Sequence, residues 1–262
     1  MLSAPPGPGG IIRLYEKDYH YLVNVRRLGA GSSFAATLPG GAETLIRVLS
    51  TVDGILIGQC EGISADGPPE GRGSIPPIAL FQGLPRGAKM DLIVRQAAEG
   101  GVSIIAPFES EYSTARLKMD SGTANAAKVK RWERIIREAR QQSGSVTETQ
   151  LRMPVGFNSI LDYWESLKKQ YRRPKGILFH QEPLEKGSIH EYLGDSPDFA
   201  ALAVGPEGGF SPREVSLLTT AGFRPFLLGD TVLRTETAAL YGTAAIRIIL
   251  LESESWIPRP AE

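Results

Sequence analysis

AVGPEGGF at residues 203–210, followed by SPREVSLLTTAGF at 211–223 and RPFLLGDTVLRTETAALYGTAAIRII at 224–249, is the most informative part of this chain. The apolar run 199–204 breaks abruptly into a glycine-rich loop, as a buried strand does at its end. A second loop, 229–237, follows another apolar run and precedes the last helix. Both loops therefore follow strand ends, which is where open α/β sheets bind their ligands.

The segment between the two loops carries the signals of a short helix. Ser211 and Glu214 form a capping box, and Pro212 suits the first helical position. Gly222 stands where a glycine commonly ends a helix. With a further strand over 224–228, this part of the chain is predicted to run strand, loop, helix, strand, loop, helix.

Composition limits the classes of protein that this chain can be. Its 262 residues suffice for one large or two ordinary domains, and 29 basic residues balance 29 acidic ones, so no overall field attracts nucleic acid. The single cysteine, Cys60, excludes a disulfide framework. Residues 1–10 lack a signal-peptide core, and residues 238–251, interrupted by Arg247, are too short to cross a membrane. We expect a cytoplasmic protein without a membrane contact.

A Gly/Pro/Ser-rich linker, GISADGPPEGRGSIPP at 62–77, separates two regions with different patterns of expected secondary structure. Before it, a helical pattern at 17–28 is accompanied by short β-type runs, which suggests a small barrel. Those runs are 11–14, 33–38, 43–50 and 54–61. After the linker, strands alternate with helices, which predicts an α/β domain with a mostly parallel sheet. Its expected strands include 78–81, 102–107 and 176–179, and its expected helices are 89–99, 124–142, 157–170 and 236–252.

The first loop, Gly205-Pro206-Glu207-Gly208-Gly209, allows the backbone to approach a ligand closely, although it could equally be only a tight turn. It matches neither the dinucleotide fingerprint nor the P-loop. Glu207 places a carboxylate where a phosphate would lie, which disfavours a polyphosphate and favours a cationic or zwitterionic ligand.

The second loop contains Arg234, Thr235 and Glu236 ahead of a helix that is apolar nearly all round. Ordinary helix capping would explain Thr235 and Glu236, but it does not explain a cation at the positive end of a helix dipole. The apolar helix is either central in its domain or part of a subunit interface.

Basic residues gather in three places, although such runs are usually just solvated faces. They lie within 128–140, within 168–175, and at Arg26 and Arg27 beside His20. Three clusters in a neutral protein suggest contacts with phosphates. The three histidines lack metal-ligand spacing, so no metal site is predicted, and no nucleophile motif is present.

Three motifs, in this order, resemble the RsmE family of SPOUT-superfamily methyltransferases: GPEGGFS at 205–211, LLG at 227–229 and LRTETAA at 233–239. Further similarity covers nearly the whole chain. Residues 87–99 resemble the first SPOUT helix of the family, residues 130–143 its basic helix, and residues 20–31 its PUA-like barrel. The chain departs from the family pattern at Gly100, near Tyr112 and at Ser145, positions that concern RNA contacts more than the cofactor motifs.

The resemblance implies methylation of N3 of a specific uridine in 16S ribosomal RNA, with S-adenosylmethionine (SAM) as the methyl donor. It also implies a SPOUT α/β methyltransferase domain with a C-terminal trefoil knot over 75–262, preceded by a PUA-like RNA-binding β-barrel domain over 1–74. The partners would be 16S rRNA or the small ribosomal subunit, and a second copy of the chain in a homodimer formed through the apolar last helix.

The resemblance places the cofactor among three loops, and we treat the residues of those loops as candidates. They are Leu178, Phe179, His180, Gly205, Pro206, Glu207, Gly208, Gly209, Leu228, Gly229, Leu233, Arg234, Thr235, Thr237 and Ala238. The RNA-binding candidates are Arg13, His20, Arg26, Arg27, Lys130 and Arg134.

The reaction itself suggests roles for three charged residues. Uracil N3 carries a proton and is a poor nucleophile at neutral pH. Arg234 would stabilise the negative charge that develops on the base, and Glu207 or Glu236 would accept the proton. The alternatives are a SPOUT enzyme acting on another base or on a ribose 2′-oxygen, and a non-catalytic RNA-binding protein of ribosome assembly. A nucleotide-phosphate enzyme is disfavoured because the P-loop lysine is missing.

Overall fold

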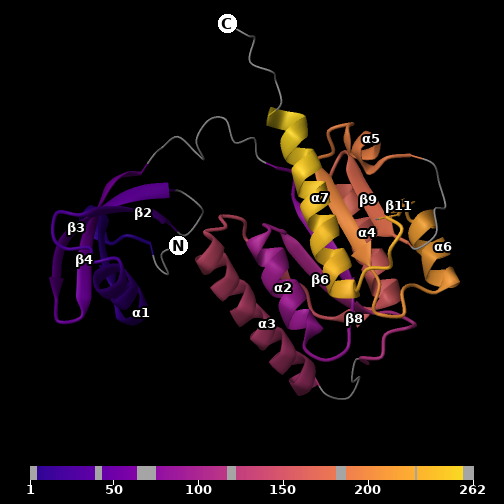
Figure 1. Cartoon of the computed structure of the whole chain (residues 1–262), viewed down its shortest axis with the longest axis horizontal. Helices are drawn as coiled ribbons and strands as arrows, with labels where there is room; N and C mark the ends of the chain where they lie inside the picture. Colours follow the sequence, from indigo (N-terminus) through magenta and orange to yellow (C-terminus); the bar gives the residue numbers. More distant parts are fainter. Residues whose placement is uncertain are drawn as a thin grey trace, which may run out of the picture. The chain divides into compact units, whose positions relative to one another are not determined.

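A computed structural model describes residues 5–38, 43–63, 75–116, 122–180, 187–227 and 229–255. The chain divides into two compact units, Met1–Arg72 and Gly73–Glu262 (Figure 1). The predicted boundary between residues 74 and 75 touches the edge of a segment outside the described residues, and the assignment of the first unit to RNA binding stays a prediction.

The first unit is an antiparallel β structure. Its four strands pair in the order β1 (Ile11–Leu14), β4 (Ile55–Ile63), β3 (Glu43–Val52) and β2 (Ser33–Thr37). Alternate residues of the strands point inward and form a small core, as the period-two pattern of a half-buried strand requires. That core comprises Ile12, Leu14, Leu22, Phe34, Leu38, Ile46, Val48 and Leu56. The short 3-10 turn η1 (Pro8–Gly10) precedes β1.

The prediction of a single α-helix over 17–28 is wrong. A single turn, α1 (Glu16–Tyr19), leads directly into the π-helix η2 (His20–Val25). Its wider winding is visible in the bond from the Arg26 N–H to the Tyr21 carbonyl, 2.9 Å long. Because this winding breaks the 3.6-residue period on which the prediction rested, Leu22 is buried in the core while Tyr21 is exposed.

The second unit contains a seven-stranded sheet in which every described pair of strands is parallel, as predicted. The strand order is β11 (Phe223–Phe226), β9 (Pro174–Phe179), β10 (Phe199–Val204), β5 (Ile78–Gly83), β6 (Ile104–Glu109) and β7 (Gln150–Leu151), with β8 (Val155–Gly156) also pairing β6. The central strand β10 is buried along its whole length, which explains its unbroken apolar sequence.

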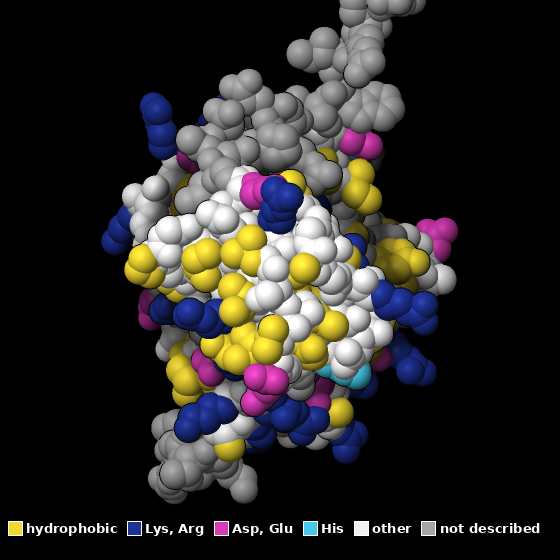
Figure 2. Space-filling view, turned by 90° about the vertical axis from the view of Figure 1, so that its left-hand side faces the viewer, with side chains coloured by type: hydrophobic (Ala, Val, Ile, Leu, Met, Phe, Trp, Pro, Cys, Tyr) yellow, Lys and Arg dark blue, Asp and Glu magenta, His cyan; other side chains and the backbone are white. Residues whose placement is uncertain are grey.

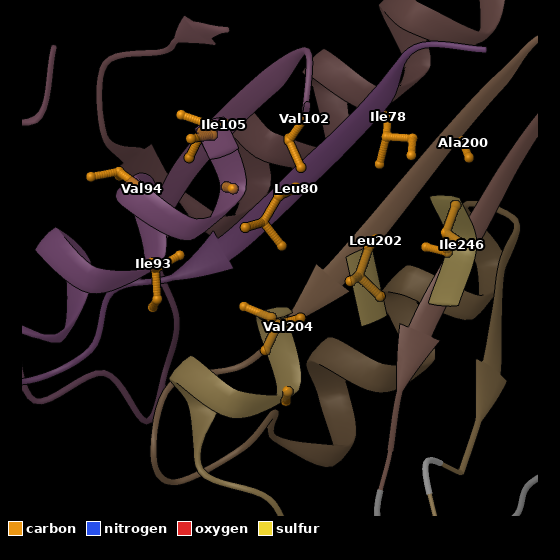
Figure 3. Close-up of a cluster of buried hydrophobic side chains, with 14 of the residues drawn as sticks. Ile78, Leu80, Ile93, Val94, Val102, Ile105, Ala200, Leu202, Val204 and Ile246 are labelled. Atoms are coloured by element: carbon orange, nitrogen blue, oxygen red, sulfur yellow. The ribbon is translucent and has the colours of Figure 1, made fainter. Parts of the chain in front are cut away.

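Helices cover both faces of this sheet (Figure 1). One face packs against α2 (Lys89–Glu99), α3 (Gly122–Ser143), α5 (Ile189–Leu193) and α7 (Thr235–Ser255), and the other against α4 (Phe157–Gln170) and α6 (Pro212–Thr220). Strand β5 serves both layers, since Ile78 and Leu80 point to the first and Ala79 and Phe81 to the second. Figure 3 shows the first of these cores, in which Leu80, Leu202 and Ile246 converge.

The helix between the two loops is confirmed in detail. Helix α6 begins at Pro212, the Ser211 hydroxyl accepts the Glu214 N–H, and the Glu214 carboxylate accepts the Ser211 N–H. Some predicted bounds differ from the observed ones. Strand β6 begins two residues later than expected, and β11 ends at Phe226, two residues earlier than expected. The two-residue strands β7 and β8 and the five-residue helix α5 were not predicted, because such short elements carry no readable period.

Candidate functional site

A cavity of about 330 Å³ lies beyond the carboxyl ends of β9 and β10. Its walls come from the end of β9, from the loop that follows β10, and from the segment that leads into α7. Lys89, at the start of α2, closes another side. The two loops singled out in the sequence therefore meet at one cavity, at the edge of the sheet where ligands of α/β proteins bind.

Most of the candidate cofactor-binding residues line this cavity. They are Phe179, His180, Gly205, Pro206, Glu207, Gly209, Gly229, Leu233, Arg234, Thr235 and Ala238. Leu178 is completely buried within the sheet, and Gly208 and Thr237 also lie outside the lining. Leu228 falls outside the described residues.

Sequence reasoning missed seven lining residues. They are Lys89, Val204, Phe210, Leu227, Asp230, Thr231 and Val232. Five of them lie directly next to predicted positions and Thr231 lies two residues from the nearest one, so extending each loop by one or two residues would have found all six. Lys89 is different, because it belongs to another element and comes near the loops only in the folded chain.

A buried chain of hydrogen bonds joins three segments beneath the cavity. Gln82, fully buried at the end of β5, donates from Nε2 to the Thr235 hydroxyl oxygen at 2.9 Å. The Thr235 hydroxyl in turn donates to the Gly205 carbonyl at 2.6 Å. One hydroxyl thus accepts from β5 and donates to the loop after β10, which uses its donor and one of its two acceptor sites.

This geometry decides how α7 begins. The Arg234 carbonyl accepts the first helical bond, from the Ala238 N–H at 2.8 Å, so Arg234 holds the N-cap position. Thr235 is therefore the first residue inside α7 and not the residue before it, so the reading of Thr235 as an ordinary N-cap is wrong. Thr235 instead pins the start of the helix to the glycine-rich loop.

The glycines of the first loop are required by close packing. A Cβ at Gly205 would lie 2.9 Å from the backbone of Gly209, and a Cβ at Gly83 would lie 2.6 Å from the Pro206 ring. The Gly209 N–H also bonds to the Pro206 carbonyl at 2.9 Å. The loop is therefore a tight turn that also lines the cavity, and its contact with a ligand stays a prediction.

Glu207 projects from this turn toward α2 and forms an ion pair. Its Oε1 accepts from Lys89 Nζ at 2.8 Å and from the Arg86 N–H at 3.0 Å. Partial burial raises the pKa of the Glu207 carboxyl, but the bonds from Lys89 and from backbone N–H groups outweigh burial, so its net pKa lies below the ordinary value. The hydrogen bond to Glu207 raises the pKa of Lys89, despite an opposing effect of burial. Both groups are therefore charged at neutral pH.

The other two candidate catalytic residues lie on either side of Thr235. Glu236 Oε2 is 3.7 Å from Lys89 Nζ, and Glu236 does not line the cavity. Arg234 lines the cavity, is exposed, and makes no ion pair with any residue that the structure describes. The arginine that helix capping could not explain is thus available to an external anion.

The RNA-binding candidates fall in both units, and all of them are at the surface. Arg13, His20, Arg26 and Arg27 are exposed in the first unit, and Lys130 and Arg134 are exposed on α3. Figure 2 shows a face on which hydrophobic side chains lie between Lys and Arg side chains, with a few acidic ones among them. This mixture is compatible with contacts to both phosphates and bases.

Within the described ranges, no cluster of three or more His, Cys, Asp and Glu residues could hold a metal ion. Likewise, none of the helices described is both long and apolar enough to span a membrane.

Comparison with known proteins identifies the family. Residues 73–247 match the family model described as an RNA methyltransferase domain. The ribosomal RNA small subunit methyltransferase E of Synechocystis is 29% identical over 91% of this chain and 73% of its own length, and that of Bacillus subtilis is 26% identical over 88% and 87%. The chain belongs to the RsmE family of RNA methyltransferases.

A solved member of the RsmE family has the same fold. The ribosomal RNA small subunit methyltransferase E of Neisseria gonorrhoeae, bound to S-adenosyl methionine, superposes with a TM-score of 0.71 at 23% identity, covering 95% of both chains. The similarity confirms the predicted fold class, an α/β domain of SPOUT type with a parallel sheet, preceded by an antiparallel β domain. The C-terminal knot stays a prediction.

The ion pair between Glu207 and Lys89 predicts a pH-dependent contribution to stability. Because the pKa of Glu207 is lower in the folded chain than in the unfolded one, the stabilisation is present at neutral pH. It is lost as the pH falls below roughly 4.3 and through the folded-state pKa. Glu207→Gln should therefore lower the stability by about 1 kcal/mol or less at pH 7 and by progressively less in acid.

Thermal unfolding of both proteins from pH 7 down to pH 3 measures this effect. Glu133→Gln, at an exposed position on α3 without a described ion pair, is the matched control and should behave as the wild type does. A difference between Glu207→Gln and wild type that stays constant over this range would contradict the ion-pair explanation.

Proposed function

We propose that this chain transfers a methyl group from SAM to N3 of a specific uridine in 16S ribosomal RNA. The observation that carries the proposal is Arg234, which forms no ion pair with a described residue, at a cavity that the two predicted ligand loops form together. A free guanidinium can stabilise an anionic base there. The RsmE family to which the chain belongs, and the small-subunit methyltransferases to which it is similar, support the same activity.

The residues of the cavity fit SAM. Val204, Phe210, Leu233 and Ala238 offer apolar surface for a purine and a ribose, while the turn at 205–209 offers backbone groups. A cavity of about 330 Å³ is at the small end of the range for ligand sites. The charge of Glu207 is only a weak argument for a cationic ligand, because Glu207 already forms an ion pair with Lys89.

The chemistry requires a proton to leave uracil N3 before or during transfer. Bound SAM supplies the methyl group. The residues of this chain hold the base, stabilise its developing negative charge and accept its proton. In the proposal, the Arg234 guanidinium faces the O2 or O4 oxygen on which negative charge develops. Glu207 is favoured over Glu236 as proton acceptor, because only Glu207 lines the cavity, although its lowered pKa makes it a weak base.

The substrate and the assembly extend beyond the cavity. We assign the first unit the role of a PUA-like RNA-binding domain that contacts phosphates through Arg13, His20, Arg26 and Arg27, aided by Lys130 and Arg134 on α3. We also propose a homodimer, because α7 exposes the large apolar residues Leu240, Tyr241, Ile248 and Leu251 along a helix whose opposite side is buried. A ribosomal substrate would place the protein in the cytoplasm.

Methyl transfer to purified small subunits, with the modified nucleotide mapped by mass spectrometry, tests the proposal. Wild-type protein should produce N3-methyluridine. Arg234→Ala should lower turnover by about 10²–10³-fold while SAM still binds, because one preorganised charge on the developing anion is removed. Arg95→Ala, at an exposed position on α2, is the control and should retain full activity.

Three results would point elsewhere. A modified ribose or another modified base would identify a different SPOUT methyltransferase. Calorimetry without SAM binding, together with retained RNA binding, would indicate a non-catalytic assembly protein. Full turnover of Arg234→Ala would remove Arg234 from the mechanism.

The role of the first unit predicts a salt-dependent loss of RNA affinity on charge reversal. Arg13→Glu combined with Arg26→Glu should weaken binding to 16S rRNA by roughly tenfold or more at low salt, because two phosphate contacts become repulsive. The difference should shrink as salt is added, and calorimetry should find the SAM affinity unchanged. Unaltered RNA binding would assign the first unit another role.

A further inference from the structure

Four charged side chains meet beside the cavity, and they are not equivalent. Lys89, Glu207 and Glu236 form one connected group, in which both carboxylates lie within ion-pair distance of the same ammonium, at 2.8 and 3.7 Å. Arg234 is near enough for its charge to oppose protonation of Lys89, yet it pairs with no described carboxylate. The two acids have therefore paired with the lysine and not with the arginine.

Lys89 occupies a position that is unfavourable for a cation by itself. It is the first residue of α2, where the helix dipole and unsatisfied N–H groups create positive potential, and Ala88 provides no side-chain cap. Arg234 adds a further positive charge nearby. The carboxylates of Glu207 and Glu236 favour the charged form of Lys89, and they come from the turn after β10 and the first turn of α7, 118 and more residues away in the sequence.

Glu236 depends on this lysine more than Glu207 does. Its side chain is 14% exposed, and its buried Oε2 accepts no hydrogen bond from the described residues. Lys89 is the one ion-pair partner that the described part of the chain offers it. Without Lys89, a nearly buried carboxylate would remain without a counter-charge, which is strongly unfavourable unless another cation moves in.

We propose that Lys89 is a positioning residue that keeps Arg234 available to the RNA by pairing with Glu207 and Glu236 in its place. Arg234 is the nearby cation that would otherwise neutralise them, and a guanidinium bound to those carboxylates could not also face a developing anion. The action of Arg234 on the uracil rests on the proposed function. The control of Arg234 pairing by Lys89 is independent of that function.

The same arrangement explains why two acids stand close to a site that must stabilise negative charge. Unpaired, they would repel an anionic base. Paired with Lys89, they tie the turn at 205–209 and the start of α7 to the start of α2, and the lysine offsets one of their two negative charges. Arg234 then brings the summed charge of the four side chains to zero, and it is the cation of the group that forms no ion pair with a described residue.

A crystal structure of Lys89→Met, without ligands, tests the pairing directly. The expected result is an Arg234 guanidinium within 4 Å of the carboxylate of Glu207 or Glu236. Lys89→Arg keeps the charge and serves as the matched control, in which Arg234 should remain unpaired. If Arg234 stays unpaired in Lys89→Met, the proposal is overturned. Lys89→Gln, which loses the same charge, takes the place of Lys89→Met should that variant not fold.

Kinetics test whether the pairing matters for turnover. Lys89→Met should lower kcat by about tenfold or more and change the KM for SAM by less than threefold, and Lys89→Arg should restore most of the loss. In an Arg234→Ala background, Lys89→Met should cause no further loss beyond threefold, because a residue that acts through Arg234 has nothing left to act on. Losses that multiply would overturn the proposal.

These outcomes separate the two proposals. Absence of methyl transfer by wild-type protein would refute the proposed function, and the crystal structure of Lys89→Met would still decide whether Lys89 controls Arg234. Conversely, active wild-type protein with multiplying losses would leave the methyltransferase assignment intact and remove the role of Lys89.

Discussion

The hydroxyl group of Thr235 is the contact on which the site depends. It accepts a hydrogen bond from Gln82 and donates one to the Gly205 carbonyl, and these partners lie 153 and 30 residues away in the sequence. All three groups are buried, so each would lose hydrogen bonding to water without gaining a replacement if the contact were absent. The end of β5, the turn after β10 and the start of α7 are thereby held in one arrangement.

The parallel sheet supplies the frame for this contact. Strands β5 and β10 are neighbours in register, with Gln82 opposite Val204, so the last residue pair of the two strands leads directly to the Gly205 turn. Helix α7 packs across the same strands, and Gly242 allows its backbone to approach Phe179 and Leu202 closely. Packing thus brings the helix to the sheet, and Thr235 determines where along the sheet it begins.

Much of this could be predicted from local patterns. The apolar run of β10, the capping box at Ser211 and the two loops after strand ends are encoded within a few residues of themselves, and the structure contains them. The motifs at 205–211, 227–229 and 233–239 together also indicated the family, which the comparisons confirm.

What could not be predicted depends on residues that meet only in the folded chain. Lys89 is an ordinary helix residue in the sequence, and nothing near it reveals two carboxylates more than a hundred residues away. Thr235 reads as a helix cap because its partner Gln82 lies in a distant strand. The π-helix at His20–Val25 was missed for another reason, since its apolar spacing imitates an α-helix while its hydrogen bonds do not.

The central claim is that the Thr235 hydroxyl holds the cavity in a form that binds SAM. Calorimetric titration of SAM into Thr235→Val and Thr235→Ser tests it most directly, because valine keeps the shape of threonine and serine keeps its hydroxyl. The claim predicts that Thr235→Ser binds SAM within about threefold of wild type, and that Thr235→Val, still folded by circular dichroism, binds at least tenfold more weakly, as expected for buried groups left unpaired. Equal affinity of Thr235→Val and wild type would contradict it.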